Sequence, residues 1–170
     1  MRIHMVPHDP NWWQEFQREA ERVSAAAGGN VVAVHHLGST AIPTVYAKPV
    51  IDLLLVVREV AALDERQPMM EALGYEARGE YGIPGRRFFR RDDERGDRTH
   101  QVHAFENGSP QIARHLAFRD YMIANPDVAQ EYSDLKRGLA AMHSEDIEAY
   151  MDGKDEFIQE IDRRAAQEGR

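Results

Sequence analysis

Residues 50–57 restrict the fold more than any other part of the sequence, because they are apolar at every position except Asp52. A short apolar run of this kind, rich in β-branched and aliphatic residues, is typical of a strand buried on both of its faces. The run therefore predicts an internal strand of a sheet that helices cover. A carboxylate inside such a strand needs a hydrogen-bonding partner or a metal ion, so Asp52 is the first candidate for a functional residue.

Helical spacing predicts a first helix near the N-terminus, with its apolar stripe at Trp12, Phe16, Ala20 and Val23. Asp9 is its predicted N-cap, with Pro10 in the first turn, and Gly28-Gly29 end it.

The remaining elements are predicted from Gly, Pro and capping residues. Besides residues 50–57, strands are expected at residues 31–37, 75–80, 87–91 and 99–105. One helix is expected over residues 60–73. Three more are expected in the last third of the chain, with N-caps at Ser109, Asn125 and Ser144, and Gly153 is expected to divide the last of these regions. This order predicts an α+β fold: a mixed sheet packed by helices, in a single domain over residues 1–170, with a sheet-containing core (1–108) and a helical C-terminal region (109–170).

Composition excludes several classes of protein. The formal net charge of −8 argues against general nucleic-acid binding, and the absence of cysteine excludes disulfides and thiolate metal sites. No apolar run is long enough to span a bilayer and no signal peptide is evident, so a cytoplasmic, soluble protein is expected. Seven arginines between residues 78 and 98 leave room for a local basic patch that binds one small anion.

The segment from His36 to Val57 carries the chemistry. Gly38-Ser39-Thr40 follow a predicted strand, where backbone N–H groups and two hydroxyls can hold a phosphate. Lys48 precedes the next strand and supplies a point positive charge. Asp52 either serves this site or caps a neighbouring backbone amide or pairs with an arginine.

Leu-Gly-Ser-Thr-Ala-Ile-Pro (37–43), followed by Ala-Lys-Pro-Val-Ile-Asp-Leu-Leu-Leu (47–55), resembles the GrpB family within the nucleotidyltransferase superfamily, whose fold is like the palm of polymerase beta. The resemblance extends over nearly the whole chain and includes residues 8–12, 103–105, 115–121, 131–136 and 150–154. It implies a nucleotidyltransferase-like fold. A GrpB-like segment also occurs fused to dephospho-coenzyme A kinase, an association with nucleotide or coenzyme chemistry.

The sequence departs from the superfamily pattern at two positions. Active nucleotidyltransferases place a second carboxylate two residues after the first, to hold two divalent cations, and this chain has Leu54 there. Gln101 replaces the first histidine of the His-x-His that is frequent in the family, while His103 remains. The resemblance thus implies one cation held by Asp52 and His103, with Mn²⁺ or Mg²⁺ expected and Zn²⁺ possible.

Other residues have a functional and a structural interpretation. Arg86 and Arg90 share one face of a predicted strand and can neutralise phosphates, or can protect a sheet edge. Lys136, Arg119 and Lys154 match family positions in the helical region, where they close over an anion or form ion pairs on the helix surface. Structural roles are expected of the remaining candidates: His35, His36, His100 and the Trp12-Trp13 pair.

Two functions follow, with a third as the simplest alternative. The first is a metal-dependent transferase acting on a nucleoside triphosphate or a related phosphorylated small molecule, with Asp52 and His103 as catalytic residues. The phosphates would contact Gly38, Ser39, Thr40, Lys48, Arg86, Arg90 and Lys136. The second is a catalytically degenerate module that binds a nucleotide or coenzyme without turnover, as Leu54 suggests. The third is an interaction protein that has kept an empty pocket.

Overall fold

The computed structural model describes residues 4–168, which form two compact units. The sheet unit comprises Pro10–Leu37 and Val50–Ile112, and the helical unit comprises residues 4–9, 38–49 and 113–168. The loop between the first two strands therefore packs with helices that follow it by more than sixty residues in the sequence.

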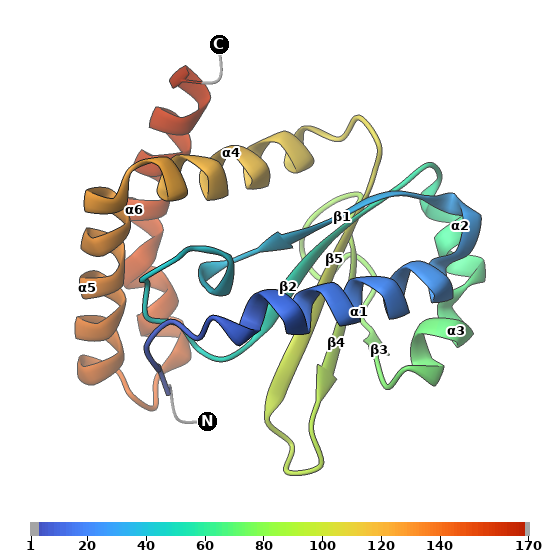
Figure 1. Cartoon of the computed structure of the whole chain (residues 1–170), viewed down its shortest axis with the longest axis horizontal. Coiled ribbons are helices and arrows are strands. Elements are labelled where there is room, and N and C mark those ends of the chain that lie inside the picture. The colour runs from blue at the N-terminus through green and yellow to red at the C-terminus, as the bar shows by residue number, and fades with distance from the viewer. Residues whose placement is uncertain (1–3, 169–170) are drawn as a thin grey trace. The chain divides into compact units, whose positions relative to one another are not determined.

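The sheet unit contains five strands in the order β1-β2-β5-β4-β3, labelled in Figure 1. Their bounds are β1 Val31–Leu37, β2 Ile51–Val57, β3 Glu76–Ala77, β4 Arg87–Asp92 and β5 Arg98–Glu106. β2 and β5 are parallel and the other pairs are antiparallel, so the sheet is mixed. The internal position predicted for residues 50–57 is confirmed, since every residue of β2 except Asp52 is buried.

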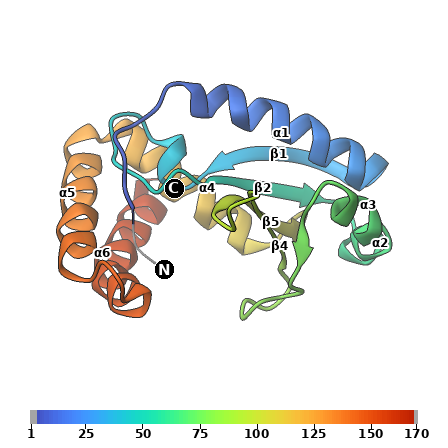
Figure 2. The ribbon, with the colours of Figure 1, turned by 90° about the horizontal axis from the view of Figure 1, so that it is seen from below.

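Three helices belong to the sheet unit: α1 (Asn11–Ala27), α2 (Val60–Glu65) and α3 (Gln67–Ala72), with short 3₁₀ turns at Gly28–Asn30 and Ser39–Ala41 flanking β1. α1 runs along β1 and β2 over one face of the sheet and buries Trp12, Phe16 and Val23 there (Figure 2).

The helical unit is built from α4 (Pro110–Ala124), α5 (Pro126–Met142) and α6 (Ile147–Glu168), the first turn of α4 being grouped with the sheet unit. Its core combines residues from these helices with two from the loop, Ile42 and Val45. The predicted α+β class, with a mixed sheet and a helical C-terminal region, is confirmed. Within residues 4–168 no helix combines the length and apolar character needed to cross a membrane.

Several predicted element boundaries were wrong. α1 begins one residue later than predicted, so that Pro10, not Asp9, occupies the N-cap position. The helix expected over residues 60–73 is broken at Arg66, because Pro68 has no N–H to donate to the carbonyl four residues earlier.

The predicted N-cap of α6 was also wrong, whereas Asn125 does occupy the N-cap position of α5. Asn125 makes no side-chain cap for α5, and its amide donates instead to the carbonyl of Tyr121. α6 starts after Ser144, and the carboxylate of Asp146 accepts from the N–H of Ala149.

Gly153 does not divide α6, which is continuous. A Cβ at this position would lie 2.5 Å from Cδ2 of Leu139 on α5, so the glycine lets the two helices approach closely. A small residue required by packing was mistaken for a helix breaker.

Candidate functional site

Asp52 and His103 are neighbours on one face of the sheet. The parallel register sets Asp52 beside Gln101, and His103 lies two residues further along β5 on the same face. The Nε2 atom of His103 is 3.0 Å from Oδ1 of Asp52, and the side chains are 17% and 22% exposed, respectively. The two predicted catalytic residues therefore form a hydrogen-bonded pair that solvent can reach.

Gln101 is the third member of this group. With its amide oriented to satisfy both neighbours, its nitrogen donates to Oδ1 of Asp52 at 2.9 Å and its oxygen accepts from Nη1 of Arg98 at 3.0 Å. Gln101 therefore helps to orient the carboxylate of Asp52.

Arg86 contacts the other side of His103. Its Nη1 atom lies 3.3 Å from Nδ1 of His103, while Nε and Nη2 donate to the carbonyls of Glu80 and Tyr81 at 3.1 and 2.8 Å. Arg86 is 8% exposed, its guanidinium lies over the ring of Phe88, and burial lowers its pKa. Arg86, predicted to bind phosphate, is thus engaged inside the protein.

These residues do not fit a divalent cation held between Asp52 and His103. Leu54, where a second carboxylate would stand, is completely buried, and residues 4–168 contain no group of three or more acidic, histidine or cysteine side chains suited to a metal ion. A histidine that ligates through one nitrogen normally donates from the other to an acceptor, whereas Arg86 can only donate.

The three lysines of the chain gather within the helical unit. Nζ of Lys48 and Nζ of Lys154 lie 5.3 and 4.7 Å from the ring centroid of Tyr150, and Nζ of Lys136 lies 4.7 Å from that of Tyr132. The pKa of Lys136 is lowered to about 7, first by burial and then by the charges of Lys154 and Lys48. Lys48 and Lys154 are therefore close enough to Lys136 for their charges to disfavour its protonated form.

Lys136 also fixes the glycine loop. Its ammonium donates to Oγ of Ser39 and to the carbonyl of Tyr46, the latter at 2.7 Å, and the side chain is 2% exposed. Gly38 has φ 74° and ψ −175°, a conformation that favours glycine, and a single 3₁₀ turn follows in which Thr40 is buried. Ser39, Lys48 and Lys136, predicted from separate motifs, thus belong to one cationic cluster.

The remaining candidates have contacts that explain them structurally. Arg90 pairs with the exposed carboxylate of Glu76, and Arg119 pairs with Asp120. His100 faces the α1 side of the sheet, where burial and Arg91 lower its pKa to about 4. His36 stacks on Phe16, whereas Trp13 is half exposed on α1.

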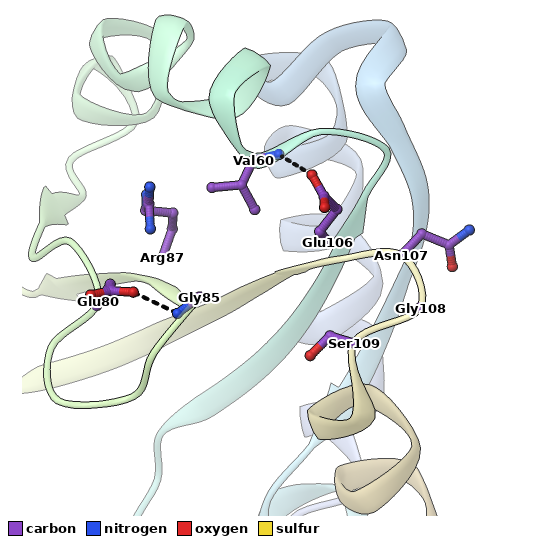
Figure 3. A pocket seen from close by; sticks show the side chains of 8 residues that line it. All are labelled: Val60, Glu80, Gly85, Arg87, Glu106, Asn107, Gly108 and Ser109. Carbon is purple, nitrogen blue, oxygen red and sulfur yellow. Dashed lines mark hydrogen bonds between the residues drawn. The ribbon is translucent and has the colours of Figure 1, made fainter.

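A pocket of about 560 Å³ lies at the C-terminal ends of β2 and β5 and contains none of the predicted site residues (Figure 3). Its charged side chains serve local structure: Glu106 accepts from the N–H of Val60, Glu80 accepts from that of Gly85, and Arg87 pairs with Asp64. We therefore do not assign the functional site to it.

Sequence reasoning missed one part of the arrangement, the two hydrogen bonds of Tyr46. Tyr46 supplies a carbonyl to Lys136 while its own N–H donates to Oγ of Ser133, and the pattern of the loop gave no sign of either bond. Convergence of the lysines had a signal in the sequence: a chain with so few lysines has each of them inside a segment that resembles the family.

The fold and this group of residues define an α+β protein with one carboxylate on an internal strand and a separate lysine cluster. The GrpB protein family model matches residues 2–164, and the chain belongs to that family. The chain is 43% identical over 164 residues to UPF0157 protein YqkA of Bacillus subtilis. The alignment covers 96% of this chain and 47% of YqkA, so the chain spans about half the length of that relative.

A crystal structure of conserved protein GrpB from Enterococcus faecalis is also similar, with a TM-score of 0.92 and 38% identity over 97% of this chain and 98% of that one. A dephospho-CoA kinase of Mycolicibacterium paratuberculosis is 31% identical over 186 residues, covering 96% of this chain and 46% of the kinase. Cid1 poly(U) polymerase gives a TM-score of 0.49 at 9% identity, covering 78% of this chain and 45% of Cid1.

Proposed function

We propose that this protein binds a nucleoside triphosphate or a related phosphorylated small molecule and transfers a nucleotidyl group from it. Its phosphates would contact the Gly38-Ser39-Thr40 turn, Lys48 and Lys136. In the transfer, the acceptor's hydroxyl oxygen would bond to the α-phosphorus, the bond from that phosphorus to pyrophosphate would break, and the hydroxyl proton would pass to solvent. Asp52, in the sheet unit, is the candidate catalytic carboxylate.

The observation that supports this proposal most strongly is the buried ammonium of Lys136. An ammonium that is 2% exposed and has two other lysines close enough to lower its pKa is costly without a counter-charge. A polyanion would supply that charge, and the Ser39 hydroxyl beside it offers a further phosphate contact.

A divalent cation, Mn²⁺ or Mg²⁺, would reach the protein with the phosphates, because Asp52 and His103 do not hold one between them. Oδ2 of Asp52 is the oxygen with which this chain would contact it. Arg90, already paired with Glu76, would have to exchange that partner to meet a phosphate.

A second function is favoured by Leu54, which is fully buried where transferases of this superfamily carry a carboxylate. In that case the protein binds the nucleotide or coenzyme and does not turn it over. Both functions share the lysine cluster and differ in the role of Asp52.

Binding is tested by isothermal titration with pyrophosphate. Lys136→Met should weaken binding by roughly 10–100-fold, the loss expected for a charge-assisted hydrogen bond of about 1.5–3 kcal/mol. Arg163→Met is the matched control, since that side chain is 61% exposed and pairs with Glu160. Equal affinity in wild type and Lys136→Met would remove the proposed phosphate contact.

Turnover is tested by incubating the protein with each nucleoside triphosphate and Mn²⁺ or Mg²⁺ and measuring pyrophosphate release. Asp52→Asn should abolish release and leave pyrophosphate binding and the fold intact. Nucleotide that raises the melting temperature of the wild type without any release would support the binding module, because a ligand that binds only the native state stabilises it by mass action.

A further inference from the structure

The hydrogen bonds around Asp52 form a chain that has an arginine at each end. At one end Arg98 bonds to the oxygen of Gln101, and Gln101 bonds to Asp52. At the other end Arg86 bonds to Nδ1 of His103, and Nε2 of His103 bonds to Asp52. Both branches meet on Oδ1 of the carboxylate.

The arginines determine the direction of every bond in this chain. A guanidinium has five N–H donors and no acceptor, so the atoms facing Arg98 and Arg86 must accept. The Gln101 oxygen then faces Arg98, which turns its amide nitrogen toward Asp52. Nδ1 of His103 likewise carries no proton, so the ring proton is on Nε2 and points at Asp52.

Arg86 is held firmly enough to impose this direction. It is 8% exposed and is bound to the carbonyls of Glu80 and Tyr81, so its donors cannot turn away from His103 without losing buried hydrogen bonds. Both hydrogen bonds from β5 end on Oδ1 of Asp52. Among residues 4–168, no side chain donates to Oδ2 in the same way.

We propose that Arg86 and Arg98 are positioning residues that direct two N–H donors onto Oδ1 of Asp52 and fix His103 as a hydrogen-bond donor rather than a metal ligand. Asp52 is thereby held in one orientation with Oδ2 presented to a ligand. When a ligand displaces the Asp52 bond, the Nε2–H of His103 is the group that can donate to an anionic oxygen.

The tautomer of His103 is a property of the ligand-free protein, so it can be tested whether or not the protein turns over a nucleotide. In ¹⁵N-resolved NMR of the wild type, His103 should show a protonated Nε2 and an unprotonated Nδ1. A proton on Nδ1 overturns the proposal, and so does a shift of the Nε2 signal to a metal-bound value when Zn²⁺ is added.

Arg86→Met provides the variant test, with Arg87→Met as control because Arg87 lies on the opposite face and pairs with Asp64. Without Arg86, Nδ1 can carry the proton and Nε2 can ligate, so His103 should become a mixture of tautomers. Added Zn²⁺ should then shift the Nε2 signal of His103 to a metal-bound value in this variant, a shift that the wild type does not show. Arg87→Met should keep the wild-type tautomer and the wild-type response to Zn²⁺.

A folded Arg86→Met protein with the wild-type His103 spectrum contradicts the role of Arg86. The wild-type measurement decides the tautomer even if this variant fails to fold.

Discussion

Asp52 is a lone carboxylate in an apolar strand, and its neighbours explain how this polar side chain is accommodated there. Two side-chain N–H groups from β5 donate to its Oδ1 atom, and the side chain is 22% exposed, so the carboxylate is both hydrogen-bonded and reached by solvent. Leu54 cannot share this role, because it is completely buried beside His103 in the register. Gln101 is therefore the residue that decides whether an amide donor or a second carboxylate lies beside Asp52.

Gln101→Glu should create a site for a divalent cation. The new carboxylate would lie against Asp52, where a neutral amide now donates at 2.9 Å, and two like charges at this distance repel each other. We expect the variant to be less stable than wild type without metal, by about 1–3 kcal/mol, and to recover on addition of Mn²⁺. Thermal unfolding with and without Mn²⁺ measures both effects.

Gln17→Glu is the control for this change, since it adds the same charge on the exposed face of α1. An equal response of both variants to Mn²⁺ would show that the effect does not arise at Asp52.

At the scale of elements, α5 organises the helical unit. Its residues Ser133, Lys136 and Arg137 occupy one helical face and all contact Tyr46: a hydroxyl accepts from its N–H, an ammonium donates to its carbonyl, and a guanidinium lies 4.0 Å from its ring centroid. The loop of residues 38–49 is therefore held by α5, and the position of Ser39 depends on that helix. α6 packs against α5 at Gly153 (Figure 1).

Gly153→Ala should destabilise the protein although alanine favours helices. The new methyl group would lie 2.5 Å from Cδ2 and 3.0 Å from Cδ1 of Leu139. Overpacking of this kind costs about 1–3 kcal/mol, against a propensity gain of about 1 kcal/mol, so we expect a net loss of about 1 kcal/mol in denaturant unfolding.

Leu139→Ala in the Gly153→Ala background should remove the conflict between the two side chains. A double-mutant cycle should therefore give a favourable coupling between the two changes. Strict additivity would show that α5 and α6 do not compete for this space.

At the scale of the whole molecule, charge is unevenly distributed. The formal net charge is −8, yet all three lysines gather in the helical unit, where two are at least nine-tenths buried: Lys136 at 2% exposed and Lys154 at 8%. The buried Lys136 makes stability depend on pH in a defined direction. Its pKa falls from 10.5 to about 7 on folding, so between these values the unfolded chain binds more protons than the native protein.

The free energy of unfolding should therefore rise as the pH increases from 7 toward 10, because the cost of burying this charge is relieved as Lys136 loses its proton. Below pH 7 the lysine is protonated in both states and adds no further pH dependence. Chemical denaturation across this range measures the slope. It should be smaller in Lys136→Met, and equal slopes in the two proteins would contradict the assigned shift.

Bound pyrophosphate should raise the pKa of Lys136 again, because its negative charge stabilises the ammonium. Binding at pH 8 should take up protons, detected as a dependence of the binding enthalpy on the buffer's ionisation enthalpy, and Lys136→Met should lose that dependence.

The sequence by itself determined the α+β class, the internal strand at residues 50–57, the alternation that sets Asp52, Gln101 and His103 on one face, and the family. These depend on the two-residue alternation of strands, on the 3.6-residue repeat of helices and on short motifs, all of which can be read from the sequence alone. Tertiary structure decided what those patterns could not. Gly153 is a packing residue because of Leu139, Arg86 is engaged inside the protein because it meets His103 on β5, and Lys136 meets Ser39 because the loop packs with α5. In each case the deciding partner is far away in the sequence, and whether a glycine ends a helix or a cation meets a phosphate depends on that partner.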